Sequence, residues 1–451
     1  MKGWARHDRA VADLCASYAA LDPAGPVRLA KPTSNLFRPR AAPQQGLDVS
    51  GLDGVIDVDP VARTADVQGM CTYEHLVDVT LQFGLVPFVV PQLRTITLGG
   101  AVTGLGIEST SLRLGLPHES VRELDVLTGS GRIVTATTDN EHADLFAAFP
   151  NSYGSLGYAV RVQIDLAPAP THVELRHVRM RDAREAAGVI EEVAATTAYS
   201  GTRVDAIDGV AFSPDETYLT LAHFTASASP PSDYTGQQIY FRSIRERPTD
   251  VLRFVDYLWR WDTDWFWCSG AFGAQHPLIR RVWPARWRRS DVYHRLVGLD
   301  QRIGVSRVLD RLTKVPGRER VIQDIEVPLE RLPEFLDWFD REVGMRPVWL
   351  CPLRTSRPWP TYPLEPGRLY VNVGFWGTVV VPAGTAPGAV NRAIEERVAA
   401  LGGHKSLYSE SFHDRATFDA LYGTAGLDAL RAVHDPDSRL STLYEKAVNN
   451  S

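Results

Sequence analysis

The sequence predicts an α+β protein built of two lobes, the second of them an antiparallel sheet with helices on one face. Three observations support this. The chain has 451 residues, more than one hydrophobic core normally serves. Hydrophobic residues make up 44% and charged residues 23%, as in an ordinary globular protein. Short alternating strands recur on both sides of a proline-rich stretch at residues 168–170, with long amphipathic helices mainly after it.

The first lobe is expected over residues 1–170. Charged residues between apolar ones at helical spacing predict a helix over residues 5–21, and alternation of apolar and polar residues predicts the strands. In order, the remaining elements are a short strand and basic loop over 27–40, two strands over 54–70, a helix over 72–84, an extended piece over 85–91, a hairpin over 121–137 and a strand over 157–170.

The second lobe is expected over residues 171–405, followed by a segment over 406–451 that returns to the first lobe. The pattern of apolar residues in the last 40 residues predicts several short helices. The second lobe should contain helices over 178–198, 332–344 and 385–403, and strands over 218–226, 320–329, 347–354 and 368–377.

Charge and cysteine content exclude several classes of protein. The net charge of −6 argues against a nucleic-acid partner, which normally needs a basic stripe. The four cysteines (Cys15, Cys71, Cys268 and Cys351) lie far apart without a CxxC pair, so we expect neither a metal site nor a disulfide framework. The first residues lack a signal-peptide pattern, and there is no run of 18 apolar residues, so a cytoplasmic location is expected.

A glycine-rich segment, "PQLRTITLGGAVTGLGIESTSLRLGL", is the strongest candidate for ligand binding. Gly99, Gly100, Gly104 and Gly106 alternate with threonine and serine residues. Glycine lets the backbone approach a ligand and present amides to phosphate oxygens, and small hydroxyls add donors. The segment fits neither GxGxxG after a strand nor a GxxxxGK[ST] loop. A diphosphate cradle and a plain glycine-rich turn between strands both remain open from spacing alone.

This segment, the hairpin "VRELDVLTGSGRIVTAT" and "DLFAAFPNSYGSLGYAVRVQIDLAPA" together resemble the FAD-binding (PCMH-type) domain of vanillyl-alcohol-oxidase-type flavoproteins, over roughly residues 25–170. Within that superfamily the chain is most similar to the Δ24-sterol reductase group and its actinobacterial methylene-fatty-acyl reductase relatives. "RVIQDIEVPLERL", "RPVWLCPLR", "LYVNVGFWG" and "LYSESFHDRATFDALY" spread this likeness over nearly the whole chain. The resemblance implies an FAD domain and a cap domain that covers the isoalloxazine ring.

The resemblance also implies which residues line the cofactor. FAD should be non-covalent, because residues 28–40 contain no histidine to attach it. Animal members carry an N-terminal membrane anchor, which we do not find here, so at most a peripheral contact with the inner face of the membrane is expected. The implied cofactor residues are Lys31, Ser34, Asn35, Thr97, Gly99, Gly100, Thr103, Gly104, Gly106, Glu108, Ser109, Ser155, Leu156, Gly157 and Val160.

The reaction that the resemblance implies is reduction of an isolated lipid C=C bond, with NADPH reducing the flavin. Because such an alkene has no carbonyl to accept negative charge, we expect a proton to add first and a hydride from flavin N5 second. The site therefore needs an acid protonated near pH 7, such as a carboxyl buried in apolar surroundings. The candidates for this acid and its partners are Asp324 and Glu326, which should share one face of a strand, Tyr408, Glu410 and His413. For each of them a structural salt bridge or a surface role is the alternative.

Four tryptophans crowd the segment "FVDYLWRWDTDWFWCSG", namely Trp259, Trp261, Trp265 and Trp267. Either they line a lipid tunnel or membrane-facing surface, or they pack the cap core with Arg260 and the neighbouring aspartates outside. A second segment, "VWPARWRRSDVYHR", combines arginines with two tryptophans. It suits anionic headgroups or a phosphate-bearing substrate, with a solvated basic helix as the alternative.

A methylene-branched fatty acyl chain on a phospholipid, reduced to a methyl branch, is preferred to a sterol side chain as the substrate. The high Ala, Arg and Asp content resembles high-GC actinobacteria, which generally make no sterols, and protonation of the CH2 end gives a tertiary cation. A methyltransferase that installs the methylene group would then be a partner. An FAD-dependent alcohol or sugar oxidase and a lipid-binding protein without chemistry are the alternatives.

Overall fold

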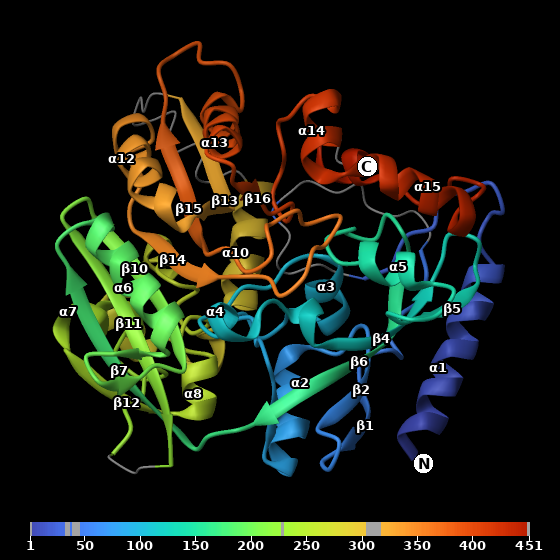
Figure 1. The fold of residues 1–451 in the computed structure, drawn as a ribbon, viewed down its shortest axis with the longest axis horizontal. Coiled ribbons are helices and arrows are strands. Elements are labelled where there is room, and N and C mark those ends of the chain that lie inside the picture. Colours follow the sequence, from blue (N-terminus) through green and yellow to red (C-terminus); the bar gives the residue numbers. More distant parts are fainter. Residues whose placement is uncertain (1, 32–36, 38–45, 227–229, 304–316, 449–451) are drawn as a thin grey trace.

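The computed structural model describes residues 2–31, 37, 46–226, 230–303 and 317–448. It contains two large antiparallel sheets that lie side by side, one in each lobe (Figure 1), and a small two-stranded sheet. The α+β class and the two-lobed arrangement are thereby confirmed. Among the described residues, none of the helices combines the length and the apolar character needed to cross a bilayer.

The first lobe is a six-stranded sheet in which β6 is the central strand. The strand order is β1-β2-β6-β4-β5, and β3 also pairs with β6. The predicted hairpin forms, with its turn after β4 at the expected glycines. The elements of this lobe are α1 (Lys2–Ala19), β1 (Val55–Asp59), β2 (Thr64–Gln68), α2 (Tyr73–Thr80), η1 (Leu81–Phe83), β3 (Leu85–Pro87), α3 (Leu98–Thr103), α4 (Ser111–Leu114), η2 (Pro117–Ser120), β4 (Val121–Leu127), β5 (Ile133–Ala136), α5 (Ala143–Ala148) and β6 (Tyr158–Pro168).

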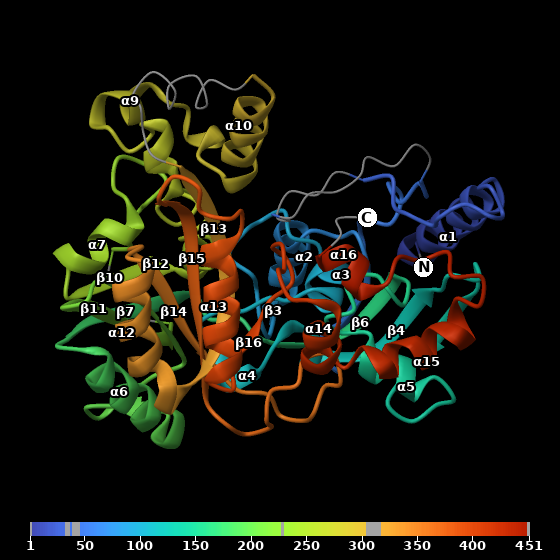
Figure 2. The same cartoon turned by 90° about the horizontal axis from the view of Figure 1, so that it is seen from above.

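The second lobe is an eight-stranded antiparallel sheet in the order β12-β7-β11-β10-β14-β15-β13-β16. Its helices α6, α12 and α13 cover one face, while α9 and α10 lie at the outer edge of the molecule (Figure 2). The elements are β7 (His172–Met180), α6 (Ala183–Thr196), β8 (Ala198–Tyr199), β9 (Thr202–Arg203), β10 (Ala206–Ser213), β11 (Glu216–Thr225), α7 (Tyr240–Glu246), β12 (Thr249–Arg253), α8 (Phe254–Leu258), η3 (Cys268–Phe272), α9 (Pro277–Val282), η4 (Ala285–Trp287), α10 (Ser290–Ile303), β13 (Arg318–Pro328), η5 (Leu329–Arg331), α12 (Leu332–Glu342), β14 (Val348–Leu353), β15 (Tyr370–Val380), α13 (Ala389–Ala400) and β16 (His404–Lys405).

Side-chain alternation gives this sheet two different faces. Val321, Ile325 and Val327 of β13 point to the face covered by helices and join a core with α6, α12 and α13. Ile322, Asp324 and Glu326 alternate with them and point the other way, toward the first lobe. On β14, Trp349 and Cys351 of that second face share a core with strands of the first lobe. Polar residues of β13 and β15 therefore face the interface between the lobes.

The C-terminal residues form three short helices, as predicted: α14 (Arg415–Tyr422), α15 (Thr424–His434) and α16 (Leu443–Ala447). Helix α15 contacts α5 of the first lobe. Arg431 of α15 donates a hydrogen bond of 2.8 Å to the carbonyl of Ser155. The chain thus returns to the first lobe after completing the second sheet.

Some sequence-based expectations differ from the structure. Residues 178–180 belong to β7 and not to the following helix, which begins after the N-cap Asp182. Strand β10 was not predicted, because it is buried on both faces and its sequence "AIDGVAFS" shows no alternation. The predicted strand near residue 29 is a single bridge between Leu29 and Leu47, and most of the basic loop lies outside the described residues.

The tryptophan segment is α-helical over α8, forms a series of turns over residues 259–267, and ends in the 3-10 helix η3. The part of the core-packing alternative that put its charges in solvent is wrong, since Arg260, Asp262 and Asp264 are 2%, 1% and 3% exposed. Each is paired inside the protein, so burial does not leave the charge without a partner. Trp265 and Phe266 have φ of 45° and 60°, a left-handed conformation that bulky residues rarely adopt.

Candidate active site

Asp324 and Glu326 lie two residues apart on β13 and point to the interface between the lobes. In the register with β15, Asp324 is opposite Gly374 and Glu326 is opposite Asn372. On its other side Glu326 is opposite His404 of β16. The prediction that both carboxyls share one face of a strand is confirmed by this register.

Three neighbours define the position of the Asp324 carboxyl. Asn372 donates a hydrogen bond of 3.1 Å from Nδ2 to Oδ1. The hydroxyl of Tyr408 is a second polar neighbour, and its interaction with the carboxyl lowers the pKa of Asp324. Gly374 leaves the room for the carboxyl, because a Cβ there would lie 2.3 Å from Asp324 Oδ1. A larger residue at position 374 would displace the acid.

Burial sets the protonation of both carboxyls. Desolvation raises the pKa of Asp324 to about 6, although the hydrogen bonds from Asn372 and Tyr408 oppose that shift. Glu326 is completely buried, and desolvation followed by the nearby Asp324 charge raises its pKa well above the usual value. Ser406 donates to Glu326 at 3.1 Å. Asp324 is therefore able to give up a proton near neutral pH, whereas Glu326 stays neutral.

Tyr153 connects the predicted cofactor segments to these carboxyls. Its backbone amide donates to the carbonyl of Thr103, at the end of α3, at 2.7 Å. Its hydroxyl accepts from the amide of Leu407 at 3.0 Å. Since Tyr408 follows directly, α3, the loop over 151–157 and the carboxyls of β13 meet around this one side chain. Tyr153 was not among the predicted site residues.

The glycines of α3 have different roles. Gly99 packs the helix onto a strand, because a Cβ there would lie 2.6 Å from the carbonyl oxygen of Gly69. A Cβ at Gly104 would lie 2.8 Å from the carbonyl oxygen of Gly100, and one at Gly106 would lie 2.9 Å from both Pro91 and Pro117. Gly100 is exposed, and its Cβ would meet only the Oγ1 of Thr97. Close packing thus explains most of these glycines, and Gly100 is the one that leaves open surface.

The first amides of α3 already have acceptors. The amide of Leu98 donates to Cys71 O and that of Gly99 to Gly69 O. The amide of Gly100 donates to Thr97 Oγ1 at 3.2 Å, so Thr97 is the N-cap. Thr103 donates back to Gly99 O at 2.6 Å. These amides are therefore committed to holding the helix against the sheet.

The loop "NSYGSLG" over residues 151–157 fits a cofactor better. Asn151 and Tyr153 have φ of 57° and 48°, and Gly154 and Gly157 also have positive φ. The amides of Ser152, Tyr153 and Ser155 donate to protein carbonyls, so the loop would meet a ligand through its side chains. Asn151 Nδ2 and Ser155 Oγ are buried and have no hydrogen-bond partner within the described part of the chain. Buried donors without partners are costly, which is what a site completed by a ligand would contain.

The other predicted cofactor residues surround these two segments. Lys31 Nζ lies 3.5 Å from Oγ1 of Thr97, the N-cap residue of α3. Leu156 and Val160 are buried in the core of the first lobe, and Val160 O accepts from the amide of Gly69. Ser34 and Asn35 lie outside the described residues.

Glu108 and Ser109 belong to a buried network between the lobes. Arg260 donates to Glu108 at 2.9 Å and to Asp208 at 3.0 Å, and its side chain is fully buried. Ser109 Oγ bonds Tyr257 OH at 2.7 Å. The side chains of Glu108 and Ser109, which were predicted to line FAD, are thus engaged with the second lobe. Nothing in the sequence pattern indicated that Arg260 is their partner.

The four predicted substrate tryptophans are placed differently. Trp259 and Trp261 are core residues, and Trp261 donates to Asp208 at 3.0 Å. Trp267 packs on Trp376 with ring centroids 5.5 Å apart. Trp265 stacks on Phe37 at 5.9 Å, and Phe37 contacts the ring of Tyr408 at the same distance. Trp265 and Trp267 therefore lie beside the neighbours of Asp324.

Glu410 and His413 are not at the candidate acid. His413 Nε2 lies 3.6 Å from Glu395 of α13. The carbonyl of Glu410 accepts a hydrogen bond from Lys405, which also pairs with Glu395 in a fully buried ion pair. These contacts fix the segment that carries Tyr408 to α13. The alternative interpretation, a structural role, describes both residues.

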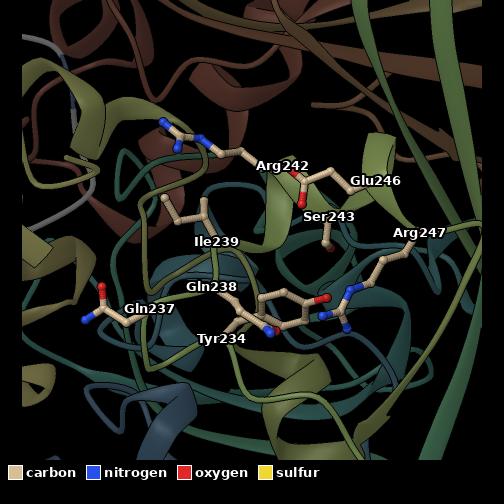
Figure 3. Close-up of a pocket in the computed structure, with 8 residues that line it drawn as sticks. All are labelled: Tyr234, Gln237, Gln238, Ile239, Arg242, Ser243, Glu246 and Arg247. Carbon is tan, nitrogen blue, oxygen red and sulfur yellow. The ribbon is translucent and has the colours of Figure 1, made fainter. Parts of the chain in front are cut away.

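A separate hollow of about 220 Å³ opens beside α7 (Figure 3). Arg247 in its wall bonds Ser232, and Arg242 bonds Gln275. None of the residues predicted for catalysis or for the cofactor lines it. Its lining residues are Tyr234, Gln237, Gln238, Ile239, Arg242, Ser243, Glu246 and Arg247.

Comparison with known proteins bears on the FAD-binding lobe and on the chain as a whole. Residues 23–137 match the FAD binding domain family. The chain is 24% identical to Δ24-sterol reductase of Homo sapiens over 411 residues, which cover 87% of this chain and 75% of that protein. It is 25% identical to Δ24-sterol reductase of Pisum sativum over 333 residues, covering 68% and 56% respectively. A shorter match, 36% identity over 119 residues, covers 26% of this chain and 22% of cytokinin dehydrogenase 7 of Oryza sativa subsp. japonica.

The fold and these matches define the chain as a flavoprotein of the oxidoreductase class, with a PCMH-type FAD-binding domain. Within that class it is similar to the Δ24-sterol reductases of animals and plants over most of its length.

Proposed function

We propose that the protein reduces an isolated C=C bond in a lipid, with NADPH as the electron donor to a non-covalently bound FAD. The proposed natural substrate is a phospholipid-bound, methylene-branched fatty acyl chain, and the product would be the corresponding methyl-branched chain. The observation that carries this proposal is the Asp324 carboxyl, held by Asn372 and Tyr408 on the sheet face that is turned to the FAD-binding lobe.

In this proposal Asp324 is the general acid. Its carboxyl proton would add to the CH2 end of the alkene, so that a new C–H bond forms from the π electrons and the other carbon becomes a tertiary cation. Bound FAD, once reduced, would supply the hydride that this carbon takes up. The pKa of about 6 supports such a role, because an acid is most effective when its pKa lies near the working pH.

The residues around Asp324 suit a cationic, water-poor reaction. Trp376 donates a hydrogen bond to Tyr408 beside the carboxyl, and the Phe37 ring contacts the Tyr408 ring. Aromatic faces stabilise a passing cation through their quadrupoles. They also offer apolar surface to an acyl chain. Asn151 and Ser155 would hold FAD, together with the open surface at Gly100.

The experiment that tests the proposal uses the purified holoprotein without oxygen. NADPH should bleach an acid-releasable yellow cofactor, and added 10-methylene-octadecanoyl phospholipid should gain two mass units per acyl chain. Bleaching without any lipid product would overturn the substrate assignment and leave the reductive half-reaction standing. Failure of NADPH to bleach the flavin would instead support a lipid-binding protein without chemistry.

A Δ24-sterol side chain is the second candidate, because relatives that match 87% of this chain are sterol reductases. Its alkene also gives a tertiary cation on protonation, so the same acid would serve. Desmosterol, offered in parallel, should remain unchanged if the acyl chain is the substrate. Oxygen consumption that depends on an added alcohol would overturn both and favour an oxidase.

A further inference from the structure

Four of the ten large apolar residues that are exposed in the described structure occur within ten residues of one another: Leu278, Ile279, Val282 and Trp287. Their exposed fractions are 70%, 39%, 79% and 49%. They lie on α9 and η4, at the outer edge of the second lobe (Figure 2). Clustered exposure of this kind marks an interaction surface, whereas scattered apolar residues need no explanation.

This surface is held outward by the inner side of the same segment. Arg280 is 1% exposed and donates to Asp264 at 2.7 Å and to the carbonyls of Gly236 and Gln238. Arg288 is also buried and donates to four carbonyls, including that of Trp283 at 2.9 Å. The segment therefore buries Arg280 and Arg288 and exposes Leu278, Ile279, Val282 and Trp287, the reverse of an ordinary surface helix.

The charge of the segment is one-sided. Residues 265–290 contain five arginines and no aspartate or glutamate, in a chain whose net charge is −6. Two of the arginines, Arg281 and Arg286, are exposed beside the apolar residues, and Arg286 lies 5.8 Å from the Trp287 ring. Arginine and tryptophan next to aliphatic side chains suit the boundary between acyl chains and headgroups. We call these six exposed residues, four apolar and two arginines, the α9 face.

We propose that the α9 face docks the protein on an anionic phospholipid bilayer. The apolar side chains would enter the headgroup region, and Arg281 and Arg286 would contact lipid phosphates. Charge complementarity favours an anionic membrane over a neutral one, because each basic residue near an anionic surface adds attraction. Salt screens this attraction. The inference rests on the proposed function in one respect only, namely that a lipid substrate requires access to a membrane.

The position of the face agrees with that requirement. Trp283, next to the face, stacks on Tyr293 of α10 with centroids 6.3 Å apart. Tyr293 packs in one apolar cluster with Trp265. Trp265 in turn stacks on Phe37, which contacts Tyr408. Continuous aromatic packing thus joins the α9 face to the candidate acid.

The test is flotation of the holoprotein with vesicles. Vesicles of equal parts phosphatidylglycerol and phosphatidylcholine should bind it about tenfold more tightly than phosphatidylcholine alone, and high salt should remove the difference. Leu278→Asp with Val282→Asp should reduce binding at least about tenfold. Arg281→Glu with Arg286→Glu should abolish the preference for phosphatidylglycerol. Val61→Asp with Val433→Asp is the matched control, because these valines are 91% and 70% exposed elsewhere and should not matter.

Equal binding by the control and the Leu278/Val282 variant would overturn the proposal, and so would failure of the wild-type holoprotein to float. A shift from dimer to monomer in that variant, without vesicle binding by the wild type, would make a second copy the occupant instead. Lipid reduction is measured separately in detergent micelles. Turnover there without flotation would reject only the docking, whereas flotation without turnover would reject only the reductase assignment.

Discussion

The indole nitrogen of Trp376 donates a hydrogen bond of 2.8 Å to the hydroxyl oxygen of Tyr408. Because an indole N–H can only donate, the Tyr408 oxygen is the acceptor, which leaves its own proton free to interact with the neighbouring Asp324 carboxyl. The pair thus orients one donor toward the candidate acid, which favours the ionised form of that acid. Burial of the carboxyl has the opposite and larger effect, because it disfavours the charged form, and the pKa of Asp324 is raised to about 6.

Tyr408→Phe should therefore raise the pKa of Asp324. The removed hydrogen bond stabilises the carboxylate, and such charge-assisted bonds contribute roughly 1.5–3 kcal/mol. The pH above which kcat/KM for lipid reduction declines should move upward by about one unit, at about 1.36 kcal/mol per unit. Tyr218→Phe, on β11 and outside this cluster, should leave the profile unchanged. An unaltered profile in the Tyr408 variant would mean that this tyrosine does not act on the acid.

Asp324→Asn should reduce lipid reduction by about a thousandfold, in the range that general acids contribute. Flavin bleaching by NADPH should stay within about twofold, because that half-reaction uses no proton from Asp324. Glu326→Gln is the matched variant, since an amide replaces a carboxyl that is already neutral, and it should cost about tenfold or less. Rates are measured by stopped flow for each half-reaction. A larger loss for Glu326→Gln would assign the acid to Glu326.

The raised pKa of Asp324 also predicts how stability depends on pH. The folded protein binds this proton more tightly than the unfolded chain, whose carboxyl has a pKa of 3.8. The free energy of unfolding should thus fall as the pH rises from about 4 to about 6. Above that range the free energy of unfolding should stay lower by the full amount, about 3 kcal/mol. In urea unfolding of the apoprotein, Asp324→Asn should be more stable than wild type at pH 8 and not at pH 4. Equal differences at both pH values would contradict this.

Ser155→Ala should weaken FAD binding about tenfold, the effect of one lost hydrogen bond. Because Ser155 Oγ is buried and has no partner in the described structure, the stability of the apoprotein should be unchanged or slightly higher. Ser152→Ala is the contrast, since Ser152 donates to Phe149 O at 2.7 Å and its loss should lower stability instead. Fluorescence titration with FAD and thermal unfolding separate the two effects. Tight FAD binding by Ser155→Ala would remove this hydroxyl from the cofactor site.

Arg260→Met should destabilise the protein by about 3–5 kcal/mol, because it leaves Glu108 and Asp208 buried without their cation. Adding Glu108→Gln and Asp208→Asn should recover part of that loss. Arg6→Met, which breaks an exposed pair with Asp53, should cost less than about 1 kcal/mol. Urea unfolding gives all three values. A small effect for Arg260→Met alone would show that the lobes do not depend on this network.

The sequence predicts which site residues share a strand face better than it predicts which distant residues pack against them. Period-two alternation in "VIQDIEVP" suffices to place Asp324 and Glu326 on one face, and the same alternation in "YVNVGFWG" could have added Asn372. Phe37 could not be found, because its contact with Tyr408 spans most of the chain. The burial of Arg260 was also unpredictable, since its partners Glu108 and Asp208 lie on distant elements and a charged residue normally predicts surface.

The most direct measurement is the anaerobic reoxidation of the NADPH-reduced holoprotein by 10-methylene-octadecanoyl phospholipid, followed by flavin absorbance and product mass together. The proposed function predicts that wild type regains its yellow colour as the acyl chain gains two mass units, while reduced Asp324→Asn stays bleached. A wild-type protein that stays bleached with this lipid would contradict the proposed substrate. Reoxidation of Asp324→Asn at the wild-type rate would contradict the proposed acid.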